Sequence, residues 1–328
     1  MIEISQFGAG RIGRIHAGNI AANAKARLRH VVDIDPAAAR DLAAPSGAKV
    51  SDADTALADA AVDAVVIASS TDTHASLIEA AARAGKAIFC EKPIDLDLAR
   101  AARCVDTVEA AGVAFQVGFN RRFDPSFAAL HDAIRGGRIG ALEMLTITSR
   151  DPEPPPPDYV KVSGGLFRDM MIHDFDMARW LMGSEPVELF AMAGCLVDPA
   201  IGALGDVDTA VVTLRAETGA MCQISNSRRA VYGYDQRIEA FGAAGMVQAG
   251  NRTPTTLEAS TADGVTRDKP LYFYLERYAE AYAAEIDHFI DCVQSGRSPA
   301  VGGRDGHRAL MLAEAANESL KTNRPVTV

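Results

Sequence analysis

The sequence predicts an α/β protein with a doubly wound parallel sheet at its N-terminus, followed by an α+β domain with a large, mostly antiparallel open sheet. Over residues 1–118, short apolar runs alternate with alanine-rich helical segments, which is typical of parallel strands joined by helices. A glycine-rich turn follows the first apolar run. Beyond residue 120, several β runs follow one another, separated by turn residues. We therefore expect two domains, residues 1–120 and residues 121–328.

The elements of the first domain follow from hydrophobic periodicity. Short apolar runs predict strands at Ile2–Phe7, Arg29–Asp33, Ala64–Ala68, Ala87–Cys90 and Ala114–Val117. The segments between them predict helices at Gly13–Ala24, Pro36–Ala44, Thr73–Ala84 and Asp97–Ala111. Connections of this size suit helical crossovers, so these strands should be parallel.

The second domain begins with an amphipathic stretch at Asp124–Arg135 and a strand at Ala141–Arg150. The proline run within residues 151–157 predicts a polyproline-like loop, because consecutive prolines supply no N–H donors to a sheet. One helix is expected at Phe167–Met182, closed by Gly183. The remaining expected elements are an antiparallel sheet between Val187 and about Glu258, and helices at Leu275–Ser295 and Asp305–Thr322.

Composition and charge exclude several classes of protein. Hydrophobic residues make up 48% of the 328 residues and charged residues 23%, as in an ordinary globular protein. The formal net charge of −10, with scattered basic residues, argues against a nucleic-acid partner. No apolar run approaches the ~18 residues of a membrane-spanning helix, and the N-terminus lacks a signal-peptide pattern. The widely spaced cysteines predict reduced thiols in a cytoplasmic protein and no zinc site: Cys90, Cys104, Cys195, Cys222 and Cys292.

A phosphate-binding turn is predicted where Gly8, Gly10 and Gly13 follow the first strand and open a helix. The first glycine allows the tight turn, the second lets a pyrophosphate approach the backbone, and the third lets the helix pack closely on the sheet. Asp33 closes the second strand, where an acid would bind the ribose 2′-hydroxyl and repel a 2′-phosphate. A glycine turn that serves packing alone, with Asp33 merely ending a strand, is the simpler alternative. Together the two features favour NAD over NADP.

A lysine at the edge of the predicted sheet is a candidate for the chemistry. The motif Glu91-Lys92-Pro93 directly follows the strand Ala87–Cys90, at the carboxyl edge where doubly wound sheets bind ligands. Proline fixes the turn and keeps Lys92 out of helical geometry. Lys92 is then placed to donate a hydrogen bond to an alcohol or carbonyl oxygen beside a nicotinamide. The alternative is an ordinary surface turn.

A second candidate group lies in residues 164–174. On one helix, Asp169 and His173 would stand four residues apart on the same face. Histidine is suited to removing a hydroxyl proton near neutral pH, and a neighbouring carboxylate would orient the ring and stabilise its protonated form. An exposed Asp–His helix pair is the alternative without function. The cluster has no evident third ligand, so we expect no metal.

These motifs, taken in order along the chain, resemble the glucose–fructose oxidoreductase, inositol dehydrogenase and MocA family. The resemblance covers essentially the whole chain, and the motifs together are far more specific than any one of them. Its segments are Gly8–Gly13, Thr73-His74, Glu91–Pro93, Gly118–Phe123, Gly164–Asp174 and the ending from Asp305 to Ser319. Within the family, the segment from Tyr232 to Gly242 resembles inositol 2-dehydrogenases.

The resemblance implies a Rossmann domain for NAD and a second domain whose open sheet serves contacts in a homo-oligomer, with a homotetramer favoured. It implies that His173 is the acid/base with Asp169 beside it, and that Lys92 touches both substrate and nicotinamide. The implied cofactor contacts are Gly8, Gly10, Arg11, Ile12, Gly13, Asp33, Ser70, Thr71, His74, Glu91 and Lys92. The implied substrate contacts are Lys92, Arg121, Asp151, Asp169, His173 and Tyr234.

The expected reaction is therefore NAD-dependent oxidation of a secondary alcohol on a cyclic polyol, most simply myo-inositol to 2-keto-myo-inositol (an inosose). The loop Pro154–Pro157 looks longer and stiffer than is usual in the family and adjoins Asp151, so another sugar, such as an aldose, stays open as substrate. A non-catalytic nucleotide-binding sensor is a further alternative. Retention of Lys92, Asp169 and His173 speaks against it, because binding alone requires none of them.

Overall fold

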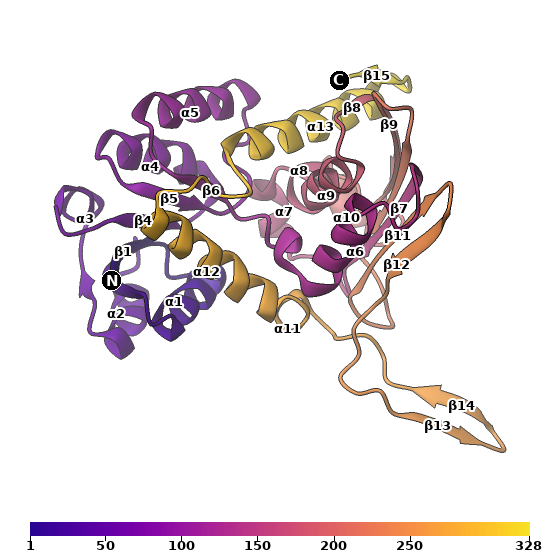
Figure 1. The fold of residues 1–328 in the computed structure, drawn as a ribbon, viewed down its shortest axis with the longest axis horizontal. Helices are drawn as coiled ribbons and strands as arrows, with labels where there is room; N and C mark the ends of the chain where they lie inside the picture. The colour runs from indigo at the N-terminus through magenta and orange to yellow at the C-terminus, as the bar shows by residue number, and fades with distance from the viewer. The chain divides into compact units, whose positions relative to one another are not determined.

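The computed structural model describes all residues, 1–328, and the chain forms two compact units (Figure 1). The first unit comprises Met1–Phe123 and Ala281–Leu310, and the second comprises Asp124–Glu280 and Met311–Val328. The first boundary lies close to the expected residue 120. The division differs from a simple two-part chain in that residues 281–310 return to the first unit.

The first unit is built on a six-stranded parallel sheet of order β3-β2-β1-β4-β5-β6. The expected strands are confirmed, with bounds β1 (Ile2–Phe7), β2 (Ala26–Val32), β4 (Ala64–Ile67), β5 (Ala87–Cys90) and β6 (Phe115–Val117). Sequence periodicity missed β3 (Lys49–Val50) because two residues are too few to show alternation. The strand order reverses between β1 and β4, and ligands of such sheets bind beyond the carboxyl ends of the strands at that point.

Helices connect these strands, and their bounds agree with the expected ones to within a few residues. They are α1 (Arg11–Ala22), α2 (Pro36–Ala43), the 3₁₀ turn η1 (Ala44–Ser46), α3 (Ala53–Ala58), α4 (Thr71–Arg83), α5 (Leu98–Ala111) and the 3₁₀ turn η2 (Asn120–Phe123). Only α3 and the short 3₁₀ turns were not expected.

A late segment completes the core of the first unit. Helix α12 (Ala279–Ser295) contributes Ile286, Phe289 and Ile290 to the apolar cluster formed by the sheet with α1 and α2. Phe289 meets Phe89 of β5 edge-on, with ring centroids 5.9 Å apart. Each such side chain contributes roughly 1.5–3 kcal/mol when fully buried, so this part of the sheet depends on residues far away in the sequence.

The second unit contains a seven-stranded sheet of order β12-β11-β7-β10-β9-β8-β15. Only the β7–β10 pairing is parallel, so the expected mostly antiparallel sheet is confirmed. Its strands are β7 (Leu142–Arg150), β8 (Pro186–Gly194), β9 (Thr209–Ala216), β10 (Met221–Ser227), β11 (Asp235–Gly242), β12 (Gly245–Ala249) and β15 (Val326–Thr327). Buried and exposed residues alternate along β9, β10 and β11, as in a sheet with one covered face.

The helices of this unit are α6 (Pro125–Arg135), α7 (Pro157–Ser163), α8 (Leu166–Asp169), α9 (Ile172–Met182), α10 (Pro199–Ala203) and α11 (Tyr274–Arg277). The last helix, α13 (Gly303–Thr322), starts in the first unit and ends in the second. A hairpin of β13 (Glu258–Thr261) and β14 (Gly264–Arg267) extends away from the large sheet, and all of its strand residues are exposed (Figure 1). None of the helices combines the length and the apolar character needed to cross a membrane.

Three expected elements differ from the structure. The helix expected at Leu275–Ser295 is two helices, α11 and α12, which are separated at Tyr278. The helix expected at Phe167–Met182 is two helices, α8 and α9, which are broken at Met170 and Met171. The proline run is not a loop throughout, because Pro157 occupies the first position of α7. A proline is tolerated there, since the first-turn N–H has no partner within the helix.

Candidate functional site

The glycine turn between β1 and α1 has the shape of a phosphate cradle. Gly8 has a φ of +102°, and a Cβ at this position would lie 2.4 Å from the carbonyl oxygen of Ala68. A Cβ on Gly13 would lie 2.2 Å from the carbonyl oxygen of Gly8. At Gly10, by contrast, an added Cβ would meet no atom within 4 Å. The outer glycines therefore make the tight turn possible, and the middle one leaves open space in front of the backbone.

The buried side chain of Gln6 holds the turn in place. The Gln6 amide nitrogen donates to the carbonyl oxygens of Gly8 at 3.0 Å and Gly13 at 2.6 Å. No side chain caps the N-terminus of α1, and its first turn carries no acid. The helix end therefore keeps the partial positive charge that attracts a phosphate.

Asp33 lies directly beside this turn. Its Oδ2 accepts from the N–H of Ala9 at 2.6 Å, and its Oδ1 accepts from the N–H of Asp35 at 2.8 Å. Two backbone bonds hold a negative carboxylate at the end of β2, where it would repel a 2′-phosphate. The turn and Asp33 together fit NAD.

Polar residues follow β4 in the same unit. Ser70 is the N-cap residue of α4, which begins at Thr71. His74 is almost completely buried, and its Nδ1 and Nε2 lie 2.8 Å and 3.2 Å from the carbonyl oxygens of Pro93 and Ser69. Burial lowers the pKa of His74, which favours the neutral ring. The ring thus lies between two strand ends, and its nearer carbonyl partner, Pro93, belongs to the turn after β5.

The motif Glu91-Lys92-Pro93 follows β5, as expected, and the Lys92–Pro93 peptide bond is cis. The Glu91 side chain points inward, with its Oε1 2.7 Å from Nε2 of the buried His16. Beyond β6, the turn η2 carries Arg121, which is buried. The Nδ2 of the neighbouring Asn120 is buried and has no hydrogen-bond partner.

The second unit carries the candidate acid and base on consecutive helices. A pair of glycines with φ of +85°, Gly164 and Gly165, separates α7 from α8. A Cβ on Gly165 would lie 2.7 Å from Oδ1 of Asp206. Asp169 is the last residue of α8 and His173 lies in the first turn of α9. The two residues were expected on one continuous helix, and the break at Met170 and Met171 corrects that expectation.

A buried arginine organises the acidic residues of this unit. The Arg228 guanidinium places Nη2 3.1 Å from Oδ2 of Asp169 and Nη1 3.7 Å from Oδ2 of Asp151, and its side chain is only 3% exposed. Burial disfavours the charged form of Arg228, but the two carboxylates outweigh this effect and raise its pKa. The Tyr159 hydroxyl donates to Oδ1 of Asp169 at 2.8 Å. Asp169 is therefore held as a carboxylate by a cation and a hydroxyl.

Two further residues named from the sequence lie in this unit. The Asp151 N–H bonds to the carbonyl oxygen of Ser227, at the paired ends of β7 and β10. Tyr234 is buried and meets the ring of Tyr278 edge-on, with centroids 5.9 Å apart. Asp174, next to His173, is fully buried and accepts from the Asn226 amide at 2.9 Å, which anchors the first turn of α9.

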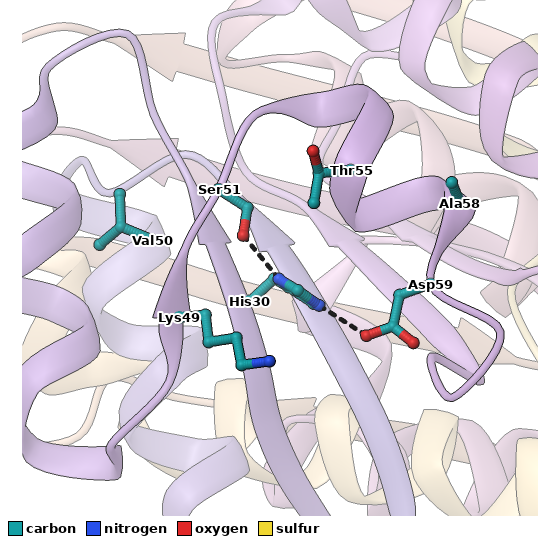
Figure 2. Close-up of a pocket in the computed structure, with 7 residues that line it drawn as sticks. All are labelled: His30, Lys49, Val50, Ser51, Thr55, Ala58 and Asp59. Carbon is teal, nitrogen blue, oxygen red and sulfur yellow. Dashed lines mark hydrogen bonds and ion pairs between the residues drawn. The ribbon is translucent and has the colours of Figure 1, made fainter.

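A surface hollow in the first unit is separate from these residues. Figure 2 shows the His30 ring between Ser51 and Asp59, at distances of 2.7 Å and 2.9 Å. Hydrogen bonds from Arg29 and His30 lower the pKa of Asp59. His30, Ser51 and Asp59 thus bond to one another, and the hollow contains none of the residues expected to act on a substrate.

Comparison with known proteins matches both units to one family. Residues 2–119 match the model of the oxidoreductase family with an NAD-binding Rossmann fold, and residues 127–248 match the GFO/IDH/MocA C-terminal domain. The inositol 2-dehydrogenase of Rhizobium meliloti (strain 1021) is 53% identical over 327 residues, covering 100% of this chain and 99% of that protein. This chain belongs to the GFO/IDH/MocA family.

Solved structures of this family share the fold. The myo-inositol dehydrogenase from Corynebacterium glutamicum ATCC 13032 has a TM-score of 0.96 at 43% identity, with 100% of this chain and 99% of that chain covered. The scyllo-inositol dehydrogenase from Lactobacillus casei, with bound NAD(H) and scyllo-inositol, has a TM-score of 0.92 at 29% identity, with coverage of 100% and 99%. As a GFO/IDH/MocA oxidoreductase, this chain uses NAD as its cofactor.

Sequence reasoning on this family member missed three polar side chains. Arg228 and Asn226 lie at the end of β10, and Tyr159 lies on α7. The only sequence signal at Arg228 was the basic pair Arg228-Arg229 just after a predicted β run. Such a pair is typical of solvated surface. No periodicity reveals that the first of the pair turns inward towards carboxylates from two other segments.

Proposed function

We propose that the protein is an inositol 2-dehydrogenase, which oxidises myo-inositol to 2-keto-myo-inositol with formation of NADH. The observation that carries the proposal is the ion pair between Arg228 and Asp169. It holds the Asp169 carboxylate at the end of α8, and α9, the next helix, carries His173. The full-length similarity to relatives named inositol 2-dehydrogenase and myo-inositol 2-dehydrogenase supports this choice of substrate. In this proposal His173 is the base and Lys92 donates a hydrogen bond to the substrate oxygen.

The cofactor is held by the first unit. Backbone N–H groups from Gly10 to Gly13 bind the phosphates, and Asp33 binds the adenosine ribose. Ser70 and Thr71, beyond β4, contribute further contacts to the cofactor. His74 and Glu91 point into the protein and position the turn that carries Lys92. When bound, NAD accepts the hydride from the carbinol carbon.

The proton follows a path through the second unit. His173 removes the hydroxyl proton as the carbinol C–H bond breaks, and the alcohol becomes a ketone. The imidazolium that forms is stabilised by the Asp169 carboxylate, which Arg228 and Tyr159 hold in place. Arg121, Asp151 and Tyr234 are the proposed partners of the other ring hydroxyls.

The substrate is tested by a panel of polyols and sugars assayed with NAD. We expect myo-inositol to be oxidised best, because residues from several segments then pair with hydroxyls around the whole ring. Tyr234→Phe should lower kcat/KM for inositol by about 5- to 150-fold, since losing a hydrogen bond in a buried site costs ~1–3 kcal/mol. An analogue that already lacks the paired hydroxyl should be affected much less. Oxidation of an aldose with none of any inositol would overturn the inositol proposal and leave the family assignment in place.

The same proposal includes a homo-oligomer, with a tetramer favoured. One face of the seven-stranded sheet carries exposed apolar residues in register across its strands, and Met144 stands opposite both Met221 and Phe241. Its members are Met144, Met192, Val211, Met221, Phe241 and Met246, each at least 40% exposed. An apolar sheet face of this extent is typical of a surface that another subunit covers. Light scattering on the purified protein should give the mass of four chains, and a monomer at micromolar concentration would contradict this.

A cytoplasmic location also belongs to this proposal, and five free cysteines support it.

A further inference from the structure

A buried cluster inside the first unit joins α1, the end of β5 and α12. Glu285 of α12 is fully buried, and neither of its carboxylate oxygens has a hydrogen-bond partner. One ligand atom from each of His16, Glu91 and Glu285 lies within 4.8 Å of the others. Two carboxylates and an imidazole thus share a site that water hardly reaches. Groups of this kind are costly to bury without partners.

We propose that Glu285 is a neutral carboxylic acid whose O–H faces the Glu91 carboxylate and so positions the turn carrying Lys92. The inference deepens the proposed function, because Lys92 is the residue proposed to contact substrate and nicotinamide. Glu285 touches neither of them and acts through Glu91. It is therefore a positioning residue, and its function depends on the carboxyl group being protonated.

The protonation state follows from burial and charge. Two carboxylates this close in a dry site cannot both ionise at moderate cost. Glu91 is the better placed of the two, because its Oε1 lies 2.7 Å from Nε2 of His16 and its side chain is 13% exposed. Burial, and then the charge of Glu91, raise the pKa of Glu285 well above its usual value. Glu285 consequently offers an O–H, and the Glu91 carboxylate, within 4.8 Å, is the acceptor that one water can bridge to it.

The surroundings leave Glu91 little freedom. A Cβ on Gly118 would lie 3.1 Å from Oε2 of Glu91, so the carboxylate sits against the backbone just after β6. On its other side it meets His16, whose ring packs edge-on against Phe89 and Tyr282. Lys92 follows Glu91 directly, so a fixed Glu91 side chain fixes the start of that turn.

The titratable groups that face Glu285 are few. They are Glu91 at the end of β5 and His16 on α1. Strand β6 presents the neutral Gln116, whose amide donates to the Glu285 backbone carbonyl at 2.9 Å. The Cys90 thiol, which donates to the Glu91 carbonyl oxygen, stays neutral because burial raises its pKa. No cation from these elements compensates a second negative charge.

The distance between His16 and Glu91 fits a hydrogen bond better than two ligands of one metal ion. Two ligands of one tetrahedral zinc, each about 2.0–2.2 Å from the metal, lie about 3.3–3.6 Å apart. The His16 Nε2 and Glu91 Oε1 atoms are 2.7 Å apart, which is the length of a hydrogen bond. The cluster also provides only three protein ligands, fewer than a closed structural zinc site needs.

The direction of the pH dependence follows from the raised pKa. Glu285 is neutral in the folded state and ionises near its ordinary pKa in the unfolded chain. Its contribution to stability is therefore complete below the ordinary carboxyl pKa and is lost as the pH rises through the raised one. A glutamine keeps the neutral shape and a donor but cannot ionise. Glu285→Gln should thus unfold at a higher temperature than the unmodified protein at about pH 8, with a smaller difference towards about pH 5.

The experiment compares Glu285→Gln with Glu285→Leu, and with Glu280→Gln as a matched control at an exposed position of the same helix. The infrared spectrum of the unmodified protein should contain a protonated carboxyl band at neutral pH that Glu285→Gln lacks and Glu280→Gln retains. Glu285→Gln should keep kcat/KM for the polyol within about 2-fold, whereas Glu285→Leu, without a donor, should lose about 10-fold.

Three results would overturn the inference. One is a carboxyl band that Glu285→Gln retains, and another is lower stability of Glu285→Gln at every pH. The third is a stoichiometric metal ion in the purified protein that Glu285→Gln no longer binds. The spectroscopic and unfolding measurements require no substrate. If the inositol proposal were wrong, the substrate panel would reveal it, and the infrared and unfolding results would be the same.

Discussion

His173→Ala is expected to lower kcat by about 10²–10⁴-fold, the usual range for the loss of general acid–base catalysis. The hydroxyl proton would then have to leave to water without a base at the start of α9. NAD binding should change little, because the glycine turn and Asp33 lie in the other unit. The measurements are kcat for the polyol and the dissociation constant of NAD, each determined as a function of pH.

A matched control is His131→Ala, which removes a histidine of the same unit that stacks on Trp180 with ring centroids 4.1 Å apart. That variant should retain kcat within about 2-fold. On the acid side, the unmodified enzyme should lose kcat/KM as His173 takes up a proton, and His173→Ala should lose this limb of the profile. A near-normal kcat for His173→Ala at neutral pH would place the base elsewhere.

The second large effect is expected for Arg228→Met. The side chain is 3% exposed and faces Asp169 and Asp151. Removing the cation leaves two carboxylates without compensation, so the free energy of unfolding should fall by about 3 kcal/mol, at the lower end for breaking a buried ion pair because both acids are partly exposed. A proton bound to Asp169 would relieve the repulsion, and it would remove the charge that supports the His173 imidazolium. We therefore expect kcat to fall as well, most strongly at low pH.

Arg228→Lys and Arg229→Met separate these contributions. Lysine keeps the charge but lacks the planar fork that reaches two carboxylates, so its effect should be intermediate. Arg229 is exposed, and its replacement should change neither stability nor kcat appreciably. Melting curves and kcat–pH profiles of the three variants measure both effects. If Arg228→Met had the stability and the pH profile of Arg229→Met, Arg228 would not hold Asp169.

Most of the fold within residues 1–123 was predictable because its signals are local. All strands except β3 are short apolar runs, all crossover helices except α3 show their own periodicity, and the three glycines of the turn lie within six residues. The proposed pair Asp169 and His173 was named from their spacing of four residues, which assumed one continuous helix. The break between α8 and α9 was not predictable, because Met170 and Met171 are good helix formers and carry no stop signal.

The remaining features depend on contacts between distant segments. Arg228 meets Asp151 and Asp169 from 77 and 59 positions away along the chain, and Glu285 meets His16 from the other end of the first unit. No spacing in the sequence encodes such pairs. Burial of Arg228 and Glu285 is also contrary to what their residue types predict, because Arg and Glu usually lie on the solvated surface.

The return of residues 281–310 to the first unit has a consequence for synthesis and for engineering. The ribosome releases the glycine turn, Asp33 and Lys92 early, but the apolar side chains of α12 that cover the sheet emerge only near the end. Until then, the face of the sheet around Ile4, Val66 and Phe89 lacks part of its cover. The nascent chain therefore exposes apolar, aggregation-prone surface through most of translation. A nucleotide-binding fragment cut at residue 123 would keep that defect permanently. A self-sufficient fragment would need residues 281–310 joined back to it by a linker.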